Sequence, residues 1–209
     1  MELSAVPLLP EVRLHQAPPD ASLFEGGYRS DEPPPFWAFA WPGGVALARY
    51  VLDHPETVAG HRVLDLAAGS GVVAVAACLA HALRVRATDV DRIALQSVRR
   101  NAQANGVTVE TECADLLDGP PPPDTDVILV GDAFYVGSLA GRMMRFLRRC
   151  ADSGALVLVG DPGREFLPRG RFTAVAEYAV PVRPALESVR HKQTAIWRLD
   201  PRRSSAPIG

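Results

Sequence analysis

The sequence predicts an α/β fold whose sheet is mostly parallel and ends in an antiparallel pair of strands. An apolar stretch and an acid, Val63-Leu64-Asp65-Leu66, run into a glycine turn that ends at Gly71, and an apolar segment follows at 72–79. This is the pattern of a strand, a tight turn and a helix. Similar short apolar segments then alternate with helical ones along most of the chain. The last two, at 172–180 and 194–199, have no clear helix between them, which indicates antiparallel pairing.

Each element follows from local signals. Residues 1–35 are expected to form an arm with one short strand at 12–14, because prolines at 18–19 and 33–35 oppose regular structure. Residues 36–200 would form the domain, and 201–209 a disordered tail. The expected helices span 45–53, 71–80, 91–105 and 138–150. The expected strands before the terminal pair span 62–66, 85–88, 107–112, 126–130 and 155–159. The fourth of these is nearly all apolar and is therefore expected at the centre of the sheet.

Composition narrows the class of protein. At 209 residues and 47% hydrophobic content, one domain with a substantial core is expected. The net charge of -2 predicts no nucleic-acid partner. Three isolated cysteines show no metal-ligand spacing and fit a reducing compartment. We see no signal peptide and no apolar stretch long enough for a membrane span, so a cytoplasmic protein without a membrane partner is expected.

The glycine turn fits two ligands. Gly69-Ser70-Gly71-Val72-Val73-Ala74 satisfies the dinucleotide fingerprint, and Asp89 follows about twenty residues later, as at an NAD site. S-adenosyl-L-methionine also needs a close backbone turn and an acid at its ribose. Asp65 favours this second ligand, because a carboxylate repels a pyrophosphate but suits a ligand that carries an ammonium and a sulfonium.

Acids recur at the ends of the expected strands. In an open parallel sheet, ligands bind beyond the carboxyl ends of the strands. Asp65 is expected to face the amino-acid part of the cofactor, and Asp89 the ribose hydroxyls. Asp115 would accept from the adenine amino group, with Leu116 against the ring, and Asp132 would lie nearest the methyl group. Asp161, beside Pro-Gly, is expected to cap a turn instead.

Four motifs carry a resemblance to a known family. They are Pro35-Phe36-Trp37-Ala38-Phe39-Ala40-Trp41-Pro42-Gly43-Gly44, Asn101-Ala102-Gln103-Ala104-Asn105-Gly106, Gly131-Asp132-Ala133-Phe134-Tyr135 and Gly160-Asp161-Pro162-Gly163-Arg164. The arrangement of strands resembles a class I methyltransferase, with a seven-strand, Rossmann-like sheet. The motifs resemble the electron-transfer-flavoprotein β-subunit lysine methyltransferase family, whose bacterial members are often labelled nicotinamide N-methylase-like.

The resemblance implies a chemistry and a set of residues. It implies in-line methyl transfer from S-adenosyl-L-methionine to protein lysine, with the flavoprotein β-subunit as the protein partner. The product of the cofactor would be S-adenosyl-L-homocysteine. Asp132 and Tyr135 match the D-x-x-Y motif of the wider group and are the expected catalytic residues, with Phe134 and Trp41 as further walls of the acceptor channel. The expected cofactor-binding residues are Trp41, Asp65, Ala67, Gly69, Ser70, Gly71, Asp89, Val90, Asp115, Leu116 and Asp132.

Three positions depart from the family pattern, and alternatives stay open. Ala67 and His81 stand where glycine is usual, and Val136 stands where an acid often follows the tyrosine. The methyl group of Ala67 is tolerable if its backbone is not left-handed. A small-molecule N-methyltransferase would keep the same cofactor rim but close residues 36–41 over its acceptor. An NAD-dependent oxidoreductase and a non-catalytic cofactor-binding module are the remaining alternatives.

Overall fold

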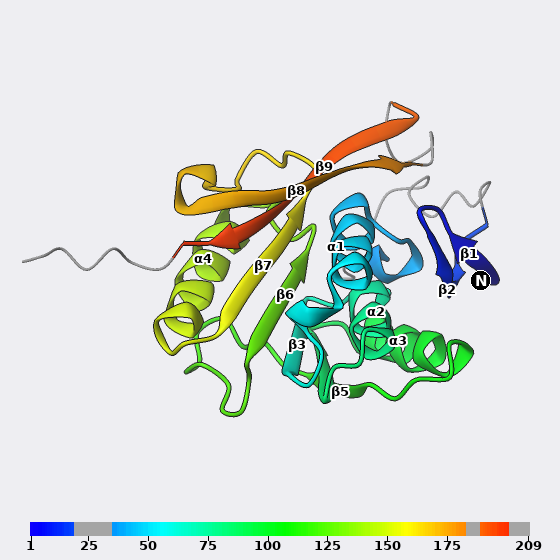
Figure 1. Cartoon of the computed structure of the whole chain (residues 1–209), viewed down its shortest axis with the longest axis horizontal. Helices are drawn as coiled ribbons and strands as arrows, with labels where there is room; N and C mark the ends of the chain where they lie inside the picture. The colour runs from blue at the N-terminus through cyan, green and yellow to red at the C-terminus, as the bar shows by residue number, and fades with distance from the viewer. Residues whose placement is uncertain (19–34, 183–188, 201–209) are drawn as a thin grey trace, which may run out of the picture.

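The sheet has the predicted topology. The computed structural model describes residues 1–18, 35–182 and 189–200. A seven-stranded sheet runs in the order β5-β4-β3-β6-β7-β9-β8 (Figure 1). Its strands are β3 Arg62–Leu66, β4 Arg84–Asp89, β5 Glu110–Cys113, β6 Val127–Gly131, β7 Leu156–Asp161, β8 Phe172–Pro181 and β9 His191–Leu199. The first five strands in that order are parallel, and β9 is antiparallel to both β7 and β8. The α/β prediction, the antiparallel terminal pair and the central position of β6 are confirmed.

Helices cover both faces of the sheet. They are α1 Pro42–Asp53, α2 Val72–Leu79, α3 Arg92–Ala104 and α4 Gly137–Asp152. Alternate strand residues face opposite sides. Val63, Val127 and Leu129 belong to one core with α1, α2 and α3, whereas Leu64 and Ile128 pack with α4. The helices lie close to the predicted ranges, but the third strand, expected at 107–112, is the shorter β5.

The first turn of α1 explains the Pro-Gly-Gly sequence. Pro42 occupies the first helical position, where its missing N–H costs nothing. A Cβ on Gly43 would overlap the carbonyl oxygen of Gly160 and the backbone nitrogen of Asp132. These glycines therefore let the helix approach the ends of β6 and β7 closely, rather than only bending the chain.

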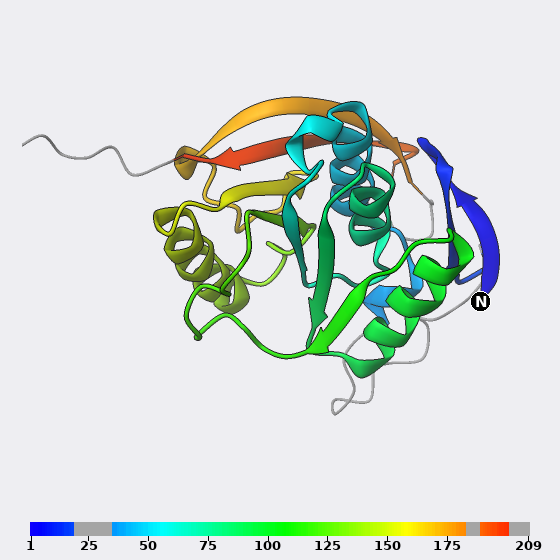
Figure 2. The same ribbon diagram turned by 60° about the horizontal axis from the view of Figure 1, so that its bottom comes forward.

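The N-terminal arm contains more structure than the sequence predicts. The strand expected at 12–14 is the middle of β2 Leu9–Gln16, which pairs with β1 Glu2–Val6 as a hairpin. Figure 2 shows the hairpin against the outer side of α3. Leu9, Val12 and Leu14 are buried in the same core as α1 to α3. The tail at 201–209, predicted to be disordered, lies outside the described residues.

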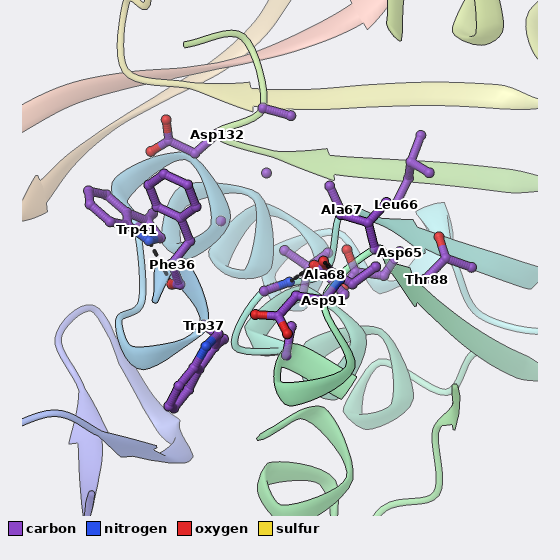
Figure 3. Close-up of a pocket in the computed structure, with 18 of the residues that line it drawn as sticks. Phe36, Trp37, Trp41, Asp65, Leu66, Ala67, Ala68, Thr88, Asp91 and Asp132 are labelled. Carbon is purple, nitrogen blue, oxygen red and sulfur yellow. Dashed lines mark hydrogen bonds between the residues drawn. The ribbon is translucent and has the colours of Figure 1, made fainter. Parts of the chain in front are cut away.

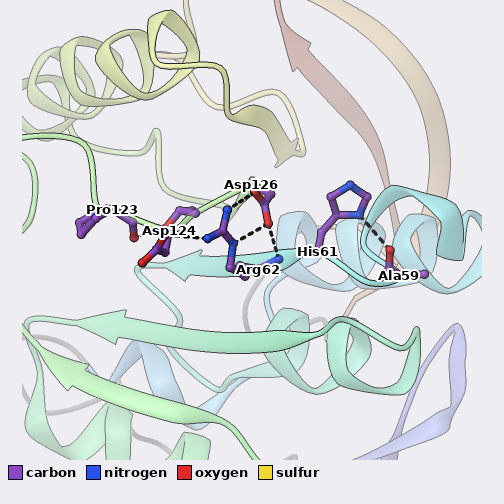
Figure 4. A network of polar contacts seen from close by, with 7 residues as sticks. Ala59, His61, Arg62, Pro123, Asp124 and Asp126 are labelled. Carbon is purple, nitrogen blue, oxygen red and sulfur yellow. Dashed lines mark hydrogen bonds and ion pairs between the residues drawn. The ribbon is translucent and has the colours of Figure 1, made fainter.

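Ion pairs join the amino-terminal ends of the neighbouring strands β3 and β6. Arg62, at the start of β3, binds Asp124 at 2.7 Å and Asp126 at 2.7 Å (Figure 4). The backbone N–H of Arg62 also donates to Asp126 at 2.8 Å. These contacts join β3 to the chain entering β6. In the described part of the chain, no helix combines the length and the apolar character that a bilayer span requires.

Candidate active site

A cavity of about 380 Å³ opens where the strand order reverses, between β3 and β6. It lies beyond the carboxyl ends of these strands, which is where ligands bind to open α/β sheets. Of the predicted catalytic and cofactor-binding residues, all but Gly71 line it. Those that do are Trp41, Asp65, Ala67, Gly69, Ser70, Asp89, Val90, Asp115, Leu116, Asp132 and Tyr135.

The glycine turn is left-handed at three points. Ala67, Gly69 and Gly71 have φ values of +58°, +52° and +77°. Ala67 was expected to be tolerated only if its backbone lay outside the left-handed region. It lies inside that region, so its side chain makes the conformation strained. Gly71 caps α2 and packs against Val98 of α3, where an added Cβ would meet Val98 atoms at 3.0–3.1 Å. Gly71 thus shapes the turn without facing the cavity.

Asp65 is a buried carboxyl group at the floor of the cavity. Only 1% of it is exposed, and its Oδ2 accepts from the backbone N–H of Ala74 at 3.0 Å. Burial raises the pKa of Asp65 to about 7, and the charge of Asp89 adds to that effect. A cationic group that enters beside Asp65 compensates for this desolvation. The position suits the ammonium of an amino-acid ligand.

Asp89 and Thr88 form the next part of the rim. Asp89 accepts from the N–H groups of Gly69 at 2.9 Å and Asp91 at 3.0 Å, one on each oxygen. A carboxylate oxygen has two acceptor sites, so each keeps capacity for a ribose hydroxyl. Burial also raises the pKa of Asp89. The Thr88 hydroxyl is buried beside the cavity and has no hydrogen-bond partner among the residues that the structure describes. Sequence reasoning missed Thr88.

Both carboxylate oxygens of Asp115, which was expected to bind the adenine amino group, already accept hydrogen bonds within the protein. Its Oδ1 accepts from the N–H of Leu117 at 3.1 Å, and its Oδ2 accepts from Arg142 at 2.8 Å. Arg142 also binds Asp118. Arg142, which lies on α4, therefore anchors the loop that carries Asp115 and Leu116. Both residues still line the cavity, and Leu117 joins them.

Asp132 lies at the opposite end of the cavity and is held by three hydrogen bonds. Its Oδ2 accepts from the N–H of Gly43 at 3.1 Å and from Arg164 Nη2 at 3.3 Å. Its Oδ1 accepts from Arg164 Nε at 2.6 Å. Arg164 ends the Gly160–Arg164 motif, but the sequence does not predict it as a site residue, because nothing in the sequence shows that it points back at Asp132. Asp132 itself has a φ of +59°.

Three aromatic rings lie at this end of the cavity. The Phe36 ring is 5.8 Å from that of Trp41 and 5.1 Å from that of Tyr135. Trp41 donates from Nε1 to the Phe36 carbonyl at 2.8 Å, which fixes both side chains. In Figure 3, Phe36 and Trp41 lie beside Asp132, across the pocket from Asp65 and Thr88. Burial raises the pKa of Tyr135, with smaller contributions from the charges of Asp89 and Asp132.

Two further predictions have different outcomes. Phe134, expected as a wall of the acceptor channel, is fully buried and packs edge-on to Phe172 in the core on the α4 side. The wall assignment of Phe134 is wrong, because the chain after β6 turns its side chain inward. Asp161 caps a turn as expected, since its Oδ1 accepts from the N–H groups of Gly163 and Arg164, both at 2.7 Å.

The site fits S-adenosyl-L-methionine. A buried carboxyl group with a raised pKa suits its ammonium, and the unpartnered Thr88 hydroxyl suits a polar group of a ligand. The apolar wall of Leu116 and Leu117 suits the flat adenine ring. Among the described residues, no group of His, Cys, Asp and Glu side chains is arranged to hold a metal ion.

Comparisons with known proteins point to methyltransferases. A family model described as ribosomal protein L11 methyltransferase (PrmA) matches residues 47–131. The electron transfer flavoprotein beta subunit lysine methyltransferase of Xenopus laevis is 34% identical over 208 residues, covering 96% of this chain and 84% of that protein. The Danio rerio protein of the same name is 38% identical over 171 residues, covering 79% of this chain and 66% of its own length. The Homo sapiens one is 32% identical, covering 93% and 76%.

Solved structures share the fold. A Pyrococcus horikoshii structure covers 88% of this chain and 95% of its own, with a TM-score of 0.59 and 15% identity. The Pyrococcus abyssi tRNA (uracil-54, C5)-methyltransferase, in complex with S-adenosyl-L-homocysteine, covers 75% of this chain and 38% of its own, with a TM-score of 0.56 and 22% identity. At these identities the likeness concerns the fold alone.

Proposed function

Because this chain belongs to the electron transfer flavoprotein β-subunit lysine methyltransferase family, we propose that it methylates lysine side chains of an electron transfer flavoprotein β-subunit. It is an S-adenosyl-L-methionine-dependent methyltransferase. The observation that carries the choice of acceptor is the Asp132 carboxylate beside the rings of Phe36, Trp41 and Tyr135, at the end of the cavity away from Asp65.

The residues divide the work between two ends of the cavity. S-adenosyl-L-methionine supplies a methyl group on a positively charged sulfur. In our assignment Asp65 binds its ammonium, Asp89 its ribose and Asp115 its adenine amino group. Asp132 accepts a hydrogen bond from the lysine amine and aims its lone pair along the methyl–sulfur axis. The three aromatic rings exclude water, and such alignment contributes much of the rate of a displacement reaction.

Labelled methyl transfer tests the acceptor. The purified chain is incubated with radiolabelled S-adenosyl-L-methionine and either the flavoprotein β-subunit of the same organism or a cell extract of that organism. The products are separated by size and mapped by mass spectrometry. The chain has a single lysine, Lys192, so self-labelling adds little background. Label on a β-subunit lysine supports the proposal. Label confined to small molecules of a cell extract would instead support the nicotinamide-like alternative.

Asp132→Ala separates chemistry from cofactor binding. We expect turnover to fall by about 100-fold or more, because the amine loses its orienting acceptor. The dissociation constant for S-adenosyl-L-homocysteine, measured by calorimetry, should change less than about threefold, since Asp132 lies away from the residues assigned to the nucleoside. Wild-type turnover in this variant would remove Asp132 from the mechanism.

A further inference from the structure

The turn after β7 directs Arg164 into the active site. β7 ends at Asp161, whose carboxylate accepts from the N–H groups of Gly163 and Arg164, both at 2.7 Å. Gly163 has a φ of +92°, a backbone conformation that residues other than glycine rarely adopt. The Gly160–Arg164 motif is thus a tight turn, and its last residue lines the cavity.

Arg164 and Asp132 form a fork-shaped ion pair. Nε and Nη2 of Arg164 reach separate oxygens of Asp132, at 2.6 Å and 3.3 Å. The side chain of Asp132 is only 4% exposed and that of Arg164 22% exposed, so the pair is shielded from water. Gly43 N–H holds one of the same oxygens. A planar guanidinium that contacts both oxygens fixes the rotation of the carboxylate in a way that a single point charge does not.

The charge of Arg164 also affects the incoming amine. Methyl transfer forms a nitrogen–carbon bond with the amine lone pair and breaks the carbon–sulfur bond, so the ammonium must first lose its proton to water. An unpaired Asp132 would favour the protonated amine, because an opposite charge stabilises it. A guanidinium on the same carboxylate offsets that effect. The other titratable groups nearby are Asp161, Tyr135 and Asp89.

We infer that Arg164 is a positioning residue for methyl transfer, which fixes the Asp132 carboxylate and keeps the acceptor amine neutral. This inference rests on the proposed transfer to an amine. It makes the motif Gly160–Arg164 part of the acceptor site rather than only the end of a strand.

The test compares full-length Arg164→Gln and Arg164→Lys with wild type. Initial rates are measured from pH 6 to 10 with the flavoprotein β-subunit and, separately, with n-butylamine as a lysine mimic. For Arg164→Gln we expect kcat at pH 7.5 to fall about tenfold or more, and the pH of half-maximal kcat to rise by about one unit. Arg164→Lys keeps the charge but not the fork, so its pH profile should stay near that of wild type while kcat falls.

Controls separate this role from folding and from cofactor binding. Arg169→Gln removes a charge from the same loop, at a residue whose guanidinium lies near Gly163, and should leave the pH profile unchanged. The affinity of Arg164→Gln for S-adenosyl-L-homocysteine should stay within about threefold of wild type. A wild-type pH profile in Arg164→Gln would overturn the inference. So would a loss of affinity for S-adenosyl-L-homocysteine as large as the loss of kcat.

The two acceptors distinguish this inference from the proposed function. If wild type methylates n-butylamine but not the β-subunit, the protein acceptor is wrong and the effect of Arg164 is still measured on the small amine. If wild type methylates the β-subunit and Arg164→Gln does so with the same rate and pH dependence, only the inference about Arg164 fails. A wild-type protein that methylates neither amine contradicts both.

Discussion

Ala67 combines a side chain with a backbone conformation that favours glycine. Its φ is +58°, in the turn that lines the cavity. An L-residue in this region costs roughly 1–2 kcal/mol, part of which the greater freedom of unfolded glycine offsets. We therefore expect Ala67→Gly to raise the free energy of unfolding in urea by about 0.5–1 kcal/mol. Binding of S-adenosyl-L-homocysteine should not weaken.

Ala68→Gly is the matched control for Ala67→Gly. Ala68 is the next residue, and it is buried and outside the left-handed region. Its replacement should lower stability by about 1 kcal/mol, because it loses a buried methyl group and gains freedom in the unfolded chain. Equal changes in the two variants would show that the conformation of Ala67 carries no strain.

Single residues also show where sequence reasoning succeeds. Asp65, Asp89 and Asp132 could be placed at one rim, because each stands at or just after the end of an expected strand and parallel strands end at the same edge. The direction of a side chain after the strand is a different matter. Phe134 turns into the core and Arg164 turns back to Asp132, and both directions depend on packing between segments far apart in the sequence.

At the scale of elements, α3 links the N-terminal hairpin to the glycine turn. Asn101 is fully buried, and its Nδ2 donates to the Ser70 carbonyl at 2.8 Å. Its Oδ1 accepts from the backbone N–H of His15 at 2.7 Å. We expect Asn101→Asp to raise the KM for S-adenosyl-L-methionine about tenfold with little change in kcat, because a carboxylate repels the Ser70 carbonyl while it still accepts from His15.

Asn105→Asp is the control for this link. Asn105 accepts from the Arg13 N–H at 2.9 Å and donates to its carbonyl at 2.6 Å, without touching the turn. This variant should loosen the hairpin, lower the melting temperature, and leave the KM for the cofactor within about twofold of wild type. If both variants raise that KM equally, the effect is one of general stability and Asn101 does not position the turn.

The hairpin also shows why one element escaped prediction. The helices and core strands have apolar periods and glycine or proline boundaries that a sequence displays directly. The partner of β2 is the mostly exposed β1, and β2 is held by packing against the core and by hydrogen bonds with Asn101 and Asn105. Side chains about ninety positions away decide whether such a strand forms, and no local pattern encodes them.

At the scale of the whole molecule, Asp65 makes stability depend on pH. Burial raises its pKa to about 7 from an ordinary value of 3.8. The folded protein therefore binds this proton more tightly than the unfolded chain. The contribution to the free energy of unfolding falls as the pH rises between about 4 and 7, by on the order of 4 kcal/mol in the ligand-free protein, and is constant above that range.

Asp65→Asn should remove this dependence, because asparagine resembles the protonated acid at every pH. Urea unfolding at several pH values is expected to show a flatter profile between pH 4 and 7 and a more stable ligand-free protein at pH 7.5. S-adenosyl-L-homocysteine should bind this variant more weakly, since the ammonium loses its counter-charge. The stability of the fold and the affinity for the cofactor would thus change in opposite directions.

Asp126→Asn provides a control of opposite sign. Its hydrogen bonds with Arg62 lower the pKa of Asp126, which lies at the amino-terminal ends of β3 and β6, remote from the cavity (Figure 4). A lowered pKa gives stability that is present above the ordinary value and is lost as the pH falls, so Asp126→Asn should lower stability at neutral pH and leave cofactor affinity intact. If Asp65→Asn instead keeps the wild-type slope between pH 4 and 7, the buried carboxyl group does not control the pH dependence of the fold.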